Sequence, residues 1–240
     1  MILGTIRKRL TRDDAQFAVS LLAQGAPSER DALEDALRQQ GLDAILDDPR
    51  LAEALLDRPS AAHASMPLLI YVLVRHTLRE ANETDRVLAD FVSGIVLHFG
   101  LHDRANRIRE HDDVRYDTLA GLVADADCGD PTRAFLVRAH LGHYALWLAG
   151  LFPDRIEAQH HRRGGPDLEY FDEMGRRGYQ MAAEHRLASE HGVNQLFETA
   201  AERFLLLRVA LNRLSDRVFF PDHHTADRLL RQVRDEGRWQ

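Results

Sequence analysis

The chain of 240 residues is 45% hydrophobic and 29% charged, which is the balance of a globular protein and excludes disorder throughout. Its formal net charge of -7 arises from 38 acidic and 31 basic residues spread along the whole chain. No basic stripe is therefore predicted that would hold a nucleic-acid backbone, and we expect neither a nucleic acid nor a membrane as a partner.

The N-terminus, MILGTIRKRLTRDD, turns charged before an apolar stretch of signal-peptide length develops. Cys128, the single cysteine, cannot form an internal disulfide bond. Both features favour a cytoplasmic protein. The basic residues are almost all arginine, with Lys8 as the one lysine, and we attribute this usage to genomic coding bias rather than to function.

Nearly every long segment has helical rather than alternating hydrophobic periodicity, which predicts an all-α protein. We expect a single multi-helix bundle of about nine to ten helices, with a charged N-terminal helical subdomain packed on it. The predicted helices are 13–24, 29–40, 50–57, 67–82, 84–99, 115–126, 131–150, 167–190, 194–218 and 223–236. The predicted parts are the subdomain at 1–60, the central bundle at 61–221, and a C-terminal helix or tail at 222–240.

The helix predicted at 67–82 contains the run LLIYVLV, which has no polar face and suits a helix surrounded by neighbours. Polar residues begin halfway along this helix. At about 100° per residue, Arg75 shares a stripe with Leu68 and Val72, whereas His76 shares another with Leu69. Arg75 and His76 are therefore candidates for an interior polar site.

Asp130 is a natural N-cap for the helix predicted at 131–150. On one face of that helix, Arg138 lies in line with three small residues, namely Gly142, Ala145 and Ala149. The helix predicted at 167–190 also carries small residues on its apolar face, namely Gly175, Gly178 and Ala182. A glycine inside a helix costs about 1 kcal/mol relative to alanine. Close packing is the expected compensation, so we predict that the two helices are neighbours and that these stripes face each other.

Two further polar residues lie on inward faces: His185 on the helix at 167–190 and Arg208 on the helix at 194–218. With Arg75, His76 and Arg138 they form a candidate cluster for an acidic small molecule or for a carboxylate of a protein partner. The alternative is that the arginines are neutralised inside the fold and fix the helix register. The acids considered for that role are Glu80, Asp90, Glu202 and Asp216.

The thirteen histidines raise the question of a metal site. His140 and His143 share one face of the helix at 131–150, but the aromatic residues on that face favour a packed pair over a metal site. The pair His102-Asp103, with His76 upstream, loosely resembles the metal-binding arrangement of HD phosphohydrolases, although chance alone accounts for such His-Asp pairs. We predict no cofactor, with a divalent metal as the alternative.

The turn HHRRGGPDLEYF combines Arg162 and Arg163 with Gly164 and Gly165 before a helix start, an arrangement that presents backbone N–H groups to an anion. Asp167 would instead cap that helix itself, which makes an ordinary turn the competing interpretation.

Common nucleotide, zinc-protease and serine-hydrolase motifs are absent from the sequence. We therefore favour a helical binding or scaffold protein over an enzyme, with a metal-dependent all-α hydrolase or oxidase as the alternative. The expected partner is a protein or a small acidic molecule, and a homodimer is also considered.

Overall fold

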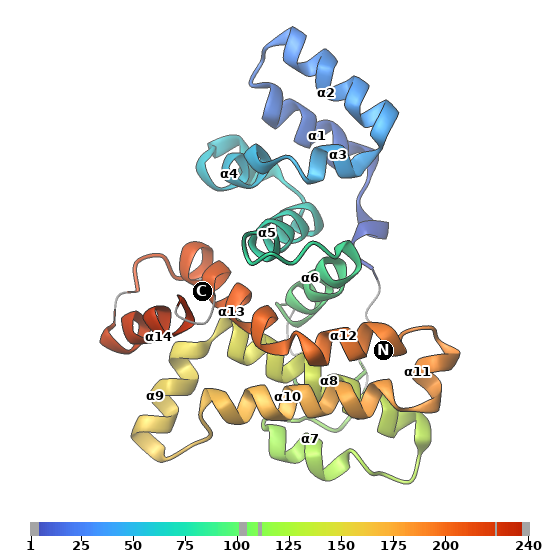
Figure 1. Ribbon diagram of the computed structural model, residues 1–240, viewed down its shortest axis with the longest axis vertical. Coiled ribbons are helices and arrows are strands. Elements are labelled where there is room, and N and C mark those ends of the chain that lie inside the picture. The colour runs from blue at the N-terminus through green and yellow to red at the C-terminus, as the bar shows by residue number, and fades with distance from the viewer. Residues whose placement is uncertain (1–4, 101–104, 110–111, 224, 237–240) are drawn as a thin grey trace. The chain divides into compact units, whose positions relative to one another are not determined.

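The computed structural model describes residues 5–100, 105–109, 112–223 and 225–236. Helices account for all regular structure in these residues, which confirms the predicted all-α class (Figure 1). The described residues up to Leu97 form one compact unit, here called the N-terminal unit, and those from His98 onward form the C-terminal unit. The predicted parts 1–60 and 61–221 do not coincide with these two units.

The N-terminal unit contains two short 3-10 helices, Arg7–Arg9 and Pro59–His63, and six α-helical segments. The α-helical segments are α1 (Arg12–Ala23), α2 (Pro27–Gln40), α3 (Leu42–Leu46), α4 (Pro49–Asp57), α5 (Met66–Glu80) and most of α6 (Arg86–Gly100). Thr11 and Asp14 form a capping box on α1, and the Ser65 hydroxyl accepts a hydrogen bond from the first turn of α5. Residues 70–78 of α5 are all buried, which confirms the predicted interior position of this helix.

The C-terminal unit contains the longest helix of the described chain, α8. Its helices are α7 (Leu119–Asp125), α8 (Pro131–Leu151), α9 (Pro153–Arg163), α10 (Leu168–Ala183), α11 (Arg186–Glu190), α12 (Asn194–Glu202), α13 (Phe204–Leu214) and α14 (Ala226–Glu236). Asp130 caps α8 and Pro131 occupies its first turn, as predicted.

The described residues contain more helices than the nine to ten predicted. Two α-helices of the structure were not predicted, and two long predicted helices are each divided into two in the structure. The missed helices are α3 and α9. The helix predicted at 167–190 is divided at His185, whose backbone is extended and whose ring accepts a hydrogen bond from the Leu187 N–H to begin α11. The helix predicted at 194–218 is divided at Arg203 and ends in a π-helical segment, Ser215–Phe219.

Helices α8 and α10 pack through their small residues, as predicted, and lie side by side in Figure 1. A Cβ atom added at Gly178 would lie 2.7 Å from the backbone nitrogen of Gly142. One added at Gly175 would lie 3.0 Å from the Cβ of Ala145. The first distance is shorter than real Cβ contacts, so this close helix approach requires glycine at 178.

Replacing Gly178 with alanine is therefore expected to destabilise the fold by about 1–3 kcal/mol, as overpacking commonly does. The new methyl group would press on the backbone of α8, which cannot rotate away, and this cost outweighs the gain of about 1 kcal/mol in helix propensity. Urea unfolding followed by circular dichroism measures the difference. Gly121→Ala is the matched control, because Gly121 also lies inside a helix and a Cβ there would lie at an ordinary distance of 3.6 Å from its nearest neighbour. Equal unfolding free energies for the two variants would contradict the prediction.

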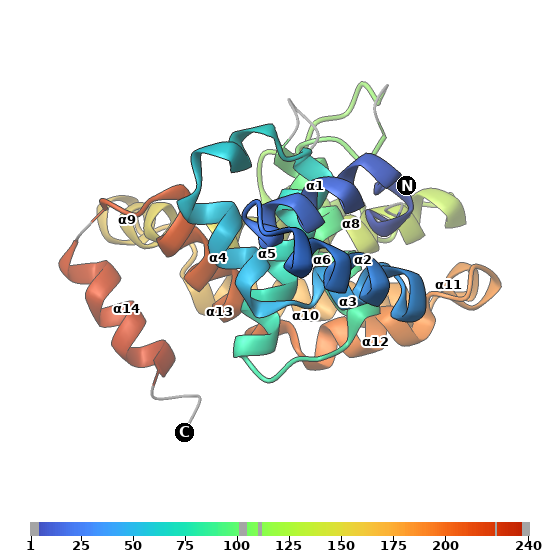
Figure 2. The same cartoon turned by 90° about the horizontal axis from the view of Figure 1, so that it is seen from above.

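Helix α14 buries its charged face and exposes its apolar one. Arg231 lies 2.9 Å from Asp216 and 3.2 Å from Asp154 of α9, and Arg228 lies 2.9 Å from Asp216. Figure 2 shows α9 and α14 on the same side of the C-terminal unit. The outward face carries three apolar residues that are 56–69% exposed, namely Leu229, Leu230 and Val233. Ion pairs rather than apolar contacts therefore attach α14 to its unit.

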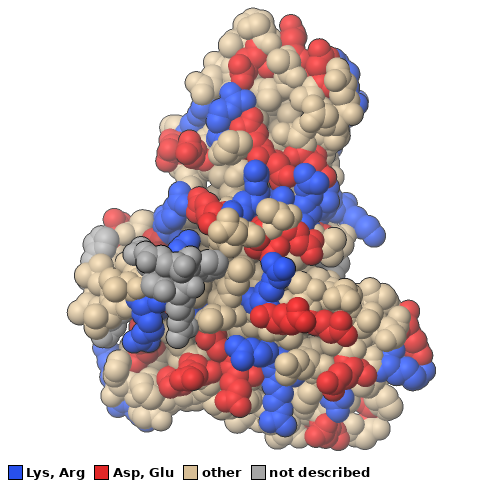
Figure 3. Space-filling view, in the orientation of Figure 1, with Lys and Arg blue, Asp and Glu red and all other residues tan. Residues whose placement is uncertain are grey.

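Charged side chains of both signs interleave on the face of the molecule shown in Figure 3. None of the described helices combines the length and the apolar character needed to cross a bilayer.

Candidate functional site

Arg75 and His76 lie in the N-terminal unit and are both buried. The Arg75 Nε lies 2.9 Å from a carboxylate oxygen of Asp47, and Arg86 binds the other oxygen of the same carboxylate at 2.6 Å. Burial alone would raise the pKa of Asp47, but the hydrogen bonds from Arg75 and Arg86 outweigh it and lower the pKa to about 2. The His76 Nε2 lies 3.0 Å from the carbonyl oxygen of Leu46. Both predicted residues thus have internal partners.

Arg138 and His185 lie in the C-terminal unit, and each also serves a local structural purpose. The guanidinium of Arg138 donates to the carbonyl of Ala126 at 3.0 Å and to the carboxylate of Asp127 at 2.7 Å. Its side chain is 23% exposed and that of Asp127 is 86% exposed, so this pair lies at the surface rather than in the interior. Burial and the nearby charge of Arg138 lower the pKa of His185, which caps α11.

Arg208 is buried on α13, as its position on the inner flank predicted. Its Nε lies 2.9 Å from Asp172 of α10, and its Nη2 lies 3.6 Å from Asp235 of α14. Its Nη1 donates a hydrogen bond of 2.7 Å to the side chain of Asn212. Arg75 and Arg208 are therefore paired inside the fold and Arg138 is paired at the surface, none of them with the acids that the sequence suggested. The partners of the two buried arginines, Asp47 and Asp172, lie far from them in the sequence.

The turn at 162–165 is an ordinary link between α9 and α10 in this structure. Gly164 ends α9 with φ 62°, in the left-handed region that favours glycine, and the carbonyl of Gly165 lies 2.6 Å from His160 Nδ1. The carboxylate of Asp167 accepts a hydrogen bond from the Tyr170 N–H at the start of α10. Arg162 and Arg163 are exposed. Asp167 thus occupies the helix start that an anion would use.

His140 and His143 of α8 are buried among aromatic rings, as we predicted for a packed pair of histidines. His140 Nε2 lies 2.8 Å from the carbonyl oxygen of Ala105, and the ring of His143 lies 5.6 Å from that of Tyr179. Within the described part of the chain, no group of three or more His, Cys, Asp or Glu side chains is placed to hold a metal ion. His102 and Asp103, named for the metal alternative, lie outside the described residues.

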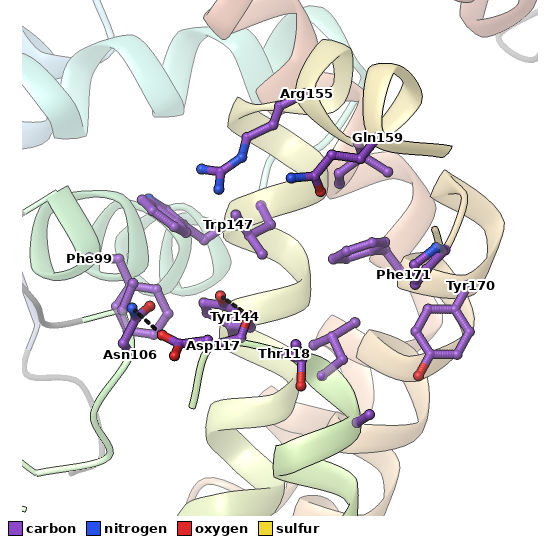
Figure 4. Close-up of a pocket in the computed structure, with 16 residues that line it drawn as sticks. Phe99, Asn106, Asp117, Thr118, Tyr144, Trp147, Arg155, Gln159, Tyr170 and Phe171 are labelled. Atoms are coloured by element: carbon purple, nitrogen blue, oxygen red, sulfur yellow. Dashed lines mark hydrogen bonds between the residues drawn. The ribbon is translucent and has the colours of Figure 1, made fainter. Parts of the chain in front are cut away.

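A pocket of about 790 Å³ opens between α7, α8, α9 and α10. Its volume lies in the range of roughly 300–1,000 Å³ that is typical of small-molecule sites. Much of the wall is aromatic, with Trp147 of α8 at the centre of the cluster. The centroid of the Trp147 ring lies 5.9 Å from the centroid of the Phe99 ring and 6.4 Å from that of the Tyr144 ring. Figure 4 shows Phe171 reaching toward the middle of the pocket from α10.

Polar groups stand at two ends of this pocket (Figure 4). Arg155 and Gln159, both from α9, lie at one end. Asp117 and Asn106 lie at the other, where the Asn106 amide donates a 3.1 Å hydrogen bond to the Asp117 carboxylate. The Tyr144 hydroxyl donates to the backbone oxygen of Asp117 at 3.4 Å, which ties this end to the aromatic wall.

The two charged groups of the pocket are not neutralised by other side chains of the described residues. Arg155 is exposed and forms no ion pair there, and Asp117 has the Asn106 amide as its side-chain partner but no basic group. Burial raises the pKa of Tyr144, the charge of Asp117 raises it further, and the charge of Arg155 lowers it. Charges of opposite sign therefore act on a single ring in the pocket wall.

Reasoning from the sequence did not identify Arg155 as a site residue. Helix α9 has the sequence PDRIEAQHHRR, with Pro153 and Ile156 as its buried residues, so it lacks the apolar stripe by which helices are recognised. The aromatic residues of α8 were interpreted as core. The signal that could have led to this pocket is the pair of aromatic residues Tyr144 and Trp147 near the end of α8.

A second cavity of about 630 Å³ lies between α9, α10, α13 and α14. Its walls are rich in charge, but the buried charges already pair with one another: Arg208 with Asp172, and Arg231 with Asp154. A ligand there would have to break ion pairs, which makes the aromatic pocket the stronger candidate.

Comparisons of the chain with protein-family models, with curated proteins and with solved structures found no match.

Proposed function

We propose that this chain is a helical binding protein that takes a small acidic molecule in the aromatic pocket of its C-terminal unit. The observation that carries the proposal is Arg155, which presents a guanidinium without a carboxylate partner among the described residues at the edge of that pocket. Guanidinium groups bind carboxylates through charge-assisted, often bidentate hydrogen bonds. The acidic ligand predicted from the sequence is retained, but Arg155 takes the place of the inward arginines.

The rest of the pocket suits an apolar or aromatic body attached to that acid. Trp147, Tyr144 and Phe171 offer flat apolar surfaces, and aromatic pairs add about 0.5–1.5 kcal/mol beyond the burial of their area. Gln159, beside Arg155, supplies an amide that can donate to the second oxygen of a carboxylate.

We propose binding rather than catalysis, because the described side chains that line the pocket include no serine, cysteine, histidine or lysine. These are the residues that most often act as nucleophiles or as general bases near neutral pH.

The first test is the affinity for two monocarboxylates, 4-ethylbenzoate and 3-(4-ethylphenyl)propionate. Arg155→Gln is expected to weaken binding of the better ligand about tenfold or more. A hydrogen bond to a charged group contributes about 1.5–3 kcal/mol, and each 1.4 kcal/mol corresponds to a factor of ten. Titration calorimetry gives the constants. Tryptophan fluorescence in a Trp239→Phe background reports on the pocket, since the chain has 2 tryptophans and Trp147 is then the remaining one.

Arg162→Gln is the matched control, because Arg162 is an exposed arginine of the same helix that does not line the pocket. It should bind both acids as the unaltered protein does. Loss of binding in this variant, with Arg155→Gln unaffected, would assign the acid to the turn at 162–165. Absence of binding to either acid at millimolar concentration would overturn the proposal.

A further inference from the structure

The pocket holds a second charge that an acidic ligand alone leaves unused. Asp117 lies at the end away from Arg155, and its carboxylate accepts one amide hydrogen bond but has no basic partner among the described residues (Figure 4). A monocarboxylate with an apolar tail would place that tail beside a carboxylate, which is unfavourable for both groups. A ligand with a positive group at that end would instead gain an ion pair.

We propose that the ligand of this pocket is a zwitterion whose ammonium and carboxylate groups are separated by an apolar or aromatic spacer. The carboxylate binds Arg155, the ammonium binds Asp117, and the spacer lies along the wall formed by Trp147 and Tyr144. This inference rests on the proposed function, since it uses the same pocket and the same contact to Arg155.

The wall next to Asp117 supports a cation at this end. Tyr144 and Phe99 present ring faces and edges near Asp117 and Asn106, and all four line the pocket. Aromatic faces attract ammonium groups, and such contacts add to a neighbouring ion pair. In an α-amino acid both charged groups are bonded to one carbon, whereas Arg155 and Asp117 lie at opposite ends of the pocket in Figure 4, so the spacer is part of the proposal.

The test compares ligands that differ in one group. 4-(Aminomethyl)benzoate and 3-[4-(aminomethyl)phenyl]propionate are each measured against the isostere in which a methyl group replaces the ammonium, namely 4-ethylbenzoate and 3-(4-ethylphenyl)propionate. In the unaltered protein, the ammonium is expected to raise the affinity of at least one acid about fivefold, because Asp117 is exposed and exposed ion pairs are weak. L-Phenylalanine, with adjacent charges, is expected to show no such gain over 3-phenylpropionate.

Asp117→Asn is expected to remove most of that gain while it leaves the affinity for the methyl isosteres within about threefold. Asp113→Asn is the matched control, because Asp113 is an exposed aspartate of the same segment that does not line the pocket. It should change neither affinity. If Asp117→Asn does not fold, the salt dependence in the unaltered protein takes its place, because the ammonium gain should shrink as salt screens the exposed ion pair.

The two proposals fail in different ways. If the methyl isosteres bind in an Arg155-dependent manner and the ammonium adds nothing, or if its gain survives Asp117→Asn, the zwitterion inference is wrong and the acid-binding function stands. If no acid depends on Arg155, the proposed function itself is wrong.

Discussion

Replacing Arg208 with methionine is expected to lower the free energy of unfolding by about 3–5 kcal/mol, the range found when one partner of a buried ion pair is removed. The Arg208 side chain is 3% exposed and lies between Asp172 of α10 and Asp235 of α14. Methionine fills a similar volume but removes the guanidinium from two carboxylates whose side chains are only 13% and 7% exposed. Chemical denaturation at neutral pH measures the loss.

Arg138→Met provides the contrast within the same unit. Its partner Asp127 is 86% exposed, and exposed ion pairs contribute about 0–1 kcal/mol. We therefore expect the loss of this ion pair in Arg138→Met to lower the free energy of unfolding by about 1 kcal/mol or less. The lost hydrogen bond to the Ala126 carbonyl adds to that effect. A loss at Arg138 as large as that at Arg208 would contradict the burial argument.

A double replacement tests the cause of the Arg208 effect. The cost of Arg208→Met can be tested by replacing Asp172 as well. If that cost comes from a negative charge on Asp172 that Arg208 no longer compensates, Arg208→Met combined with Asp172→Leu should recover much of the lost stability. The reason is that well-packed apolar residues often replace buried ion pairs without loss of stability. If the double variant is as unstable as the sum of both changes, lost packing rather than lost charge compensation explains the effect.

The parts of the fold that were predicted correctly are those specified by local sequence. Asp130-Pro131 begins α8 because a capping carboxylate and a proline act within one turn. The contact between Gly142 and Gly178 was predictable because glycines on the apolar face of a helix have few other uses. Helix α3 was missed because five residues are too few for periodicity to show. The break at His185 was missed because neither glycine nor proline marks it.

The site was less predictable because it depends on which segments meet in space. The burial of Arg75 and Arg208 follows from the helix face on which each lies. Their partners Asp47 and Asp172 lie on other elements, and periodicity along one helix carries no information about them. Arg155 belongs to a helix with almost no apolar face. Its position opposite Asp117, from the irregular segment before α7, is a property of the tertiary fold alone.

The buried histidines of α8 are expected to make the protein acid-sensitive in a pH window set by their own titration. Burial lowers the pKa of His140 from 6.5 to about 4, although the hydrogen bond to Ala105 opposes this shift. The pKa of His143 is also well below its ordinary value because of burial. Because the unfolded chain binds these protons more readily, the stabilisation is complete above about pH 6.5 and is lost as the pH falls toward 4.

The His140 shift alone corresponds to roughly 3 kcal/mol, at about 1.4 kcal/mol for each pKa unit. We expect His140→Gln to remove this part of the pH dependence, since a glutamine amide can still donate to the Ala105 carbonyl but does not titrate. Urea unfolding at intervals between pH 7 and pH 4 would show the unaltered protein losing more stability than this variant. His161→Gln, at an exposed histidine, should follow the unaltered protein.

Asp47 provides an internal check on this assignment. Its pKa is held at about 2 by Arg75 and Arg86, so its contribution is complete above about pH 4 and is lost only below that. The loss of stability between pH 6.5 and 4 therefore does not come from this carboxylate. If the unaltered protein and His140→Gln lose stability in parallel over that interval, the His140 side chain is accessible to protons in the folded state. The tight packing of α8 against its aromatic neighbours would then have to be reconsidered.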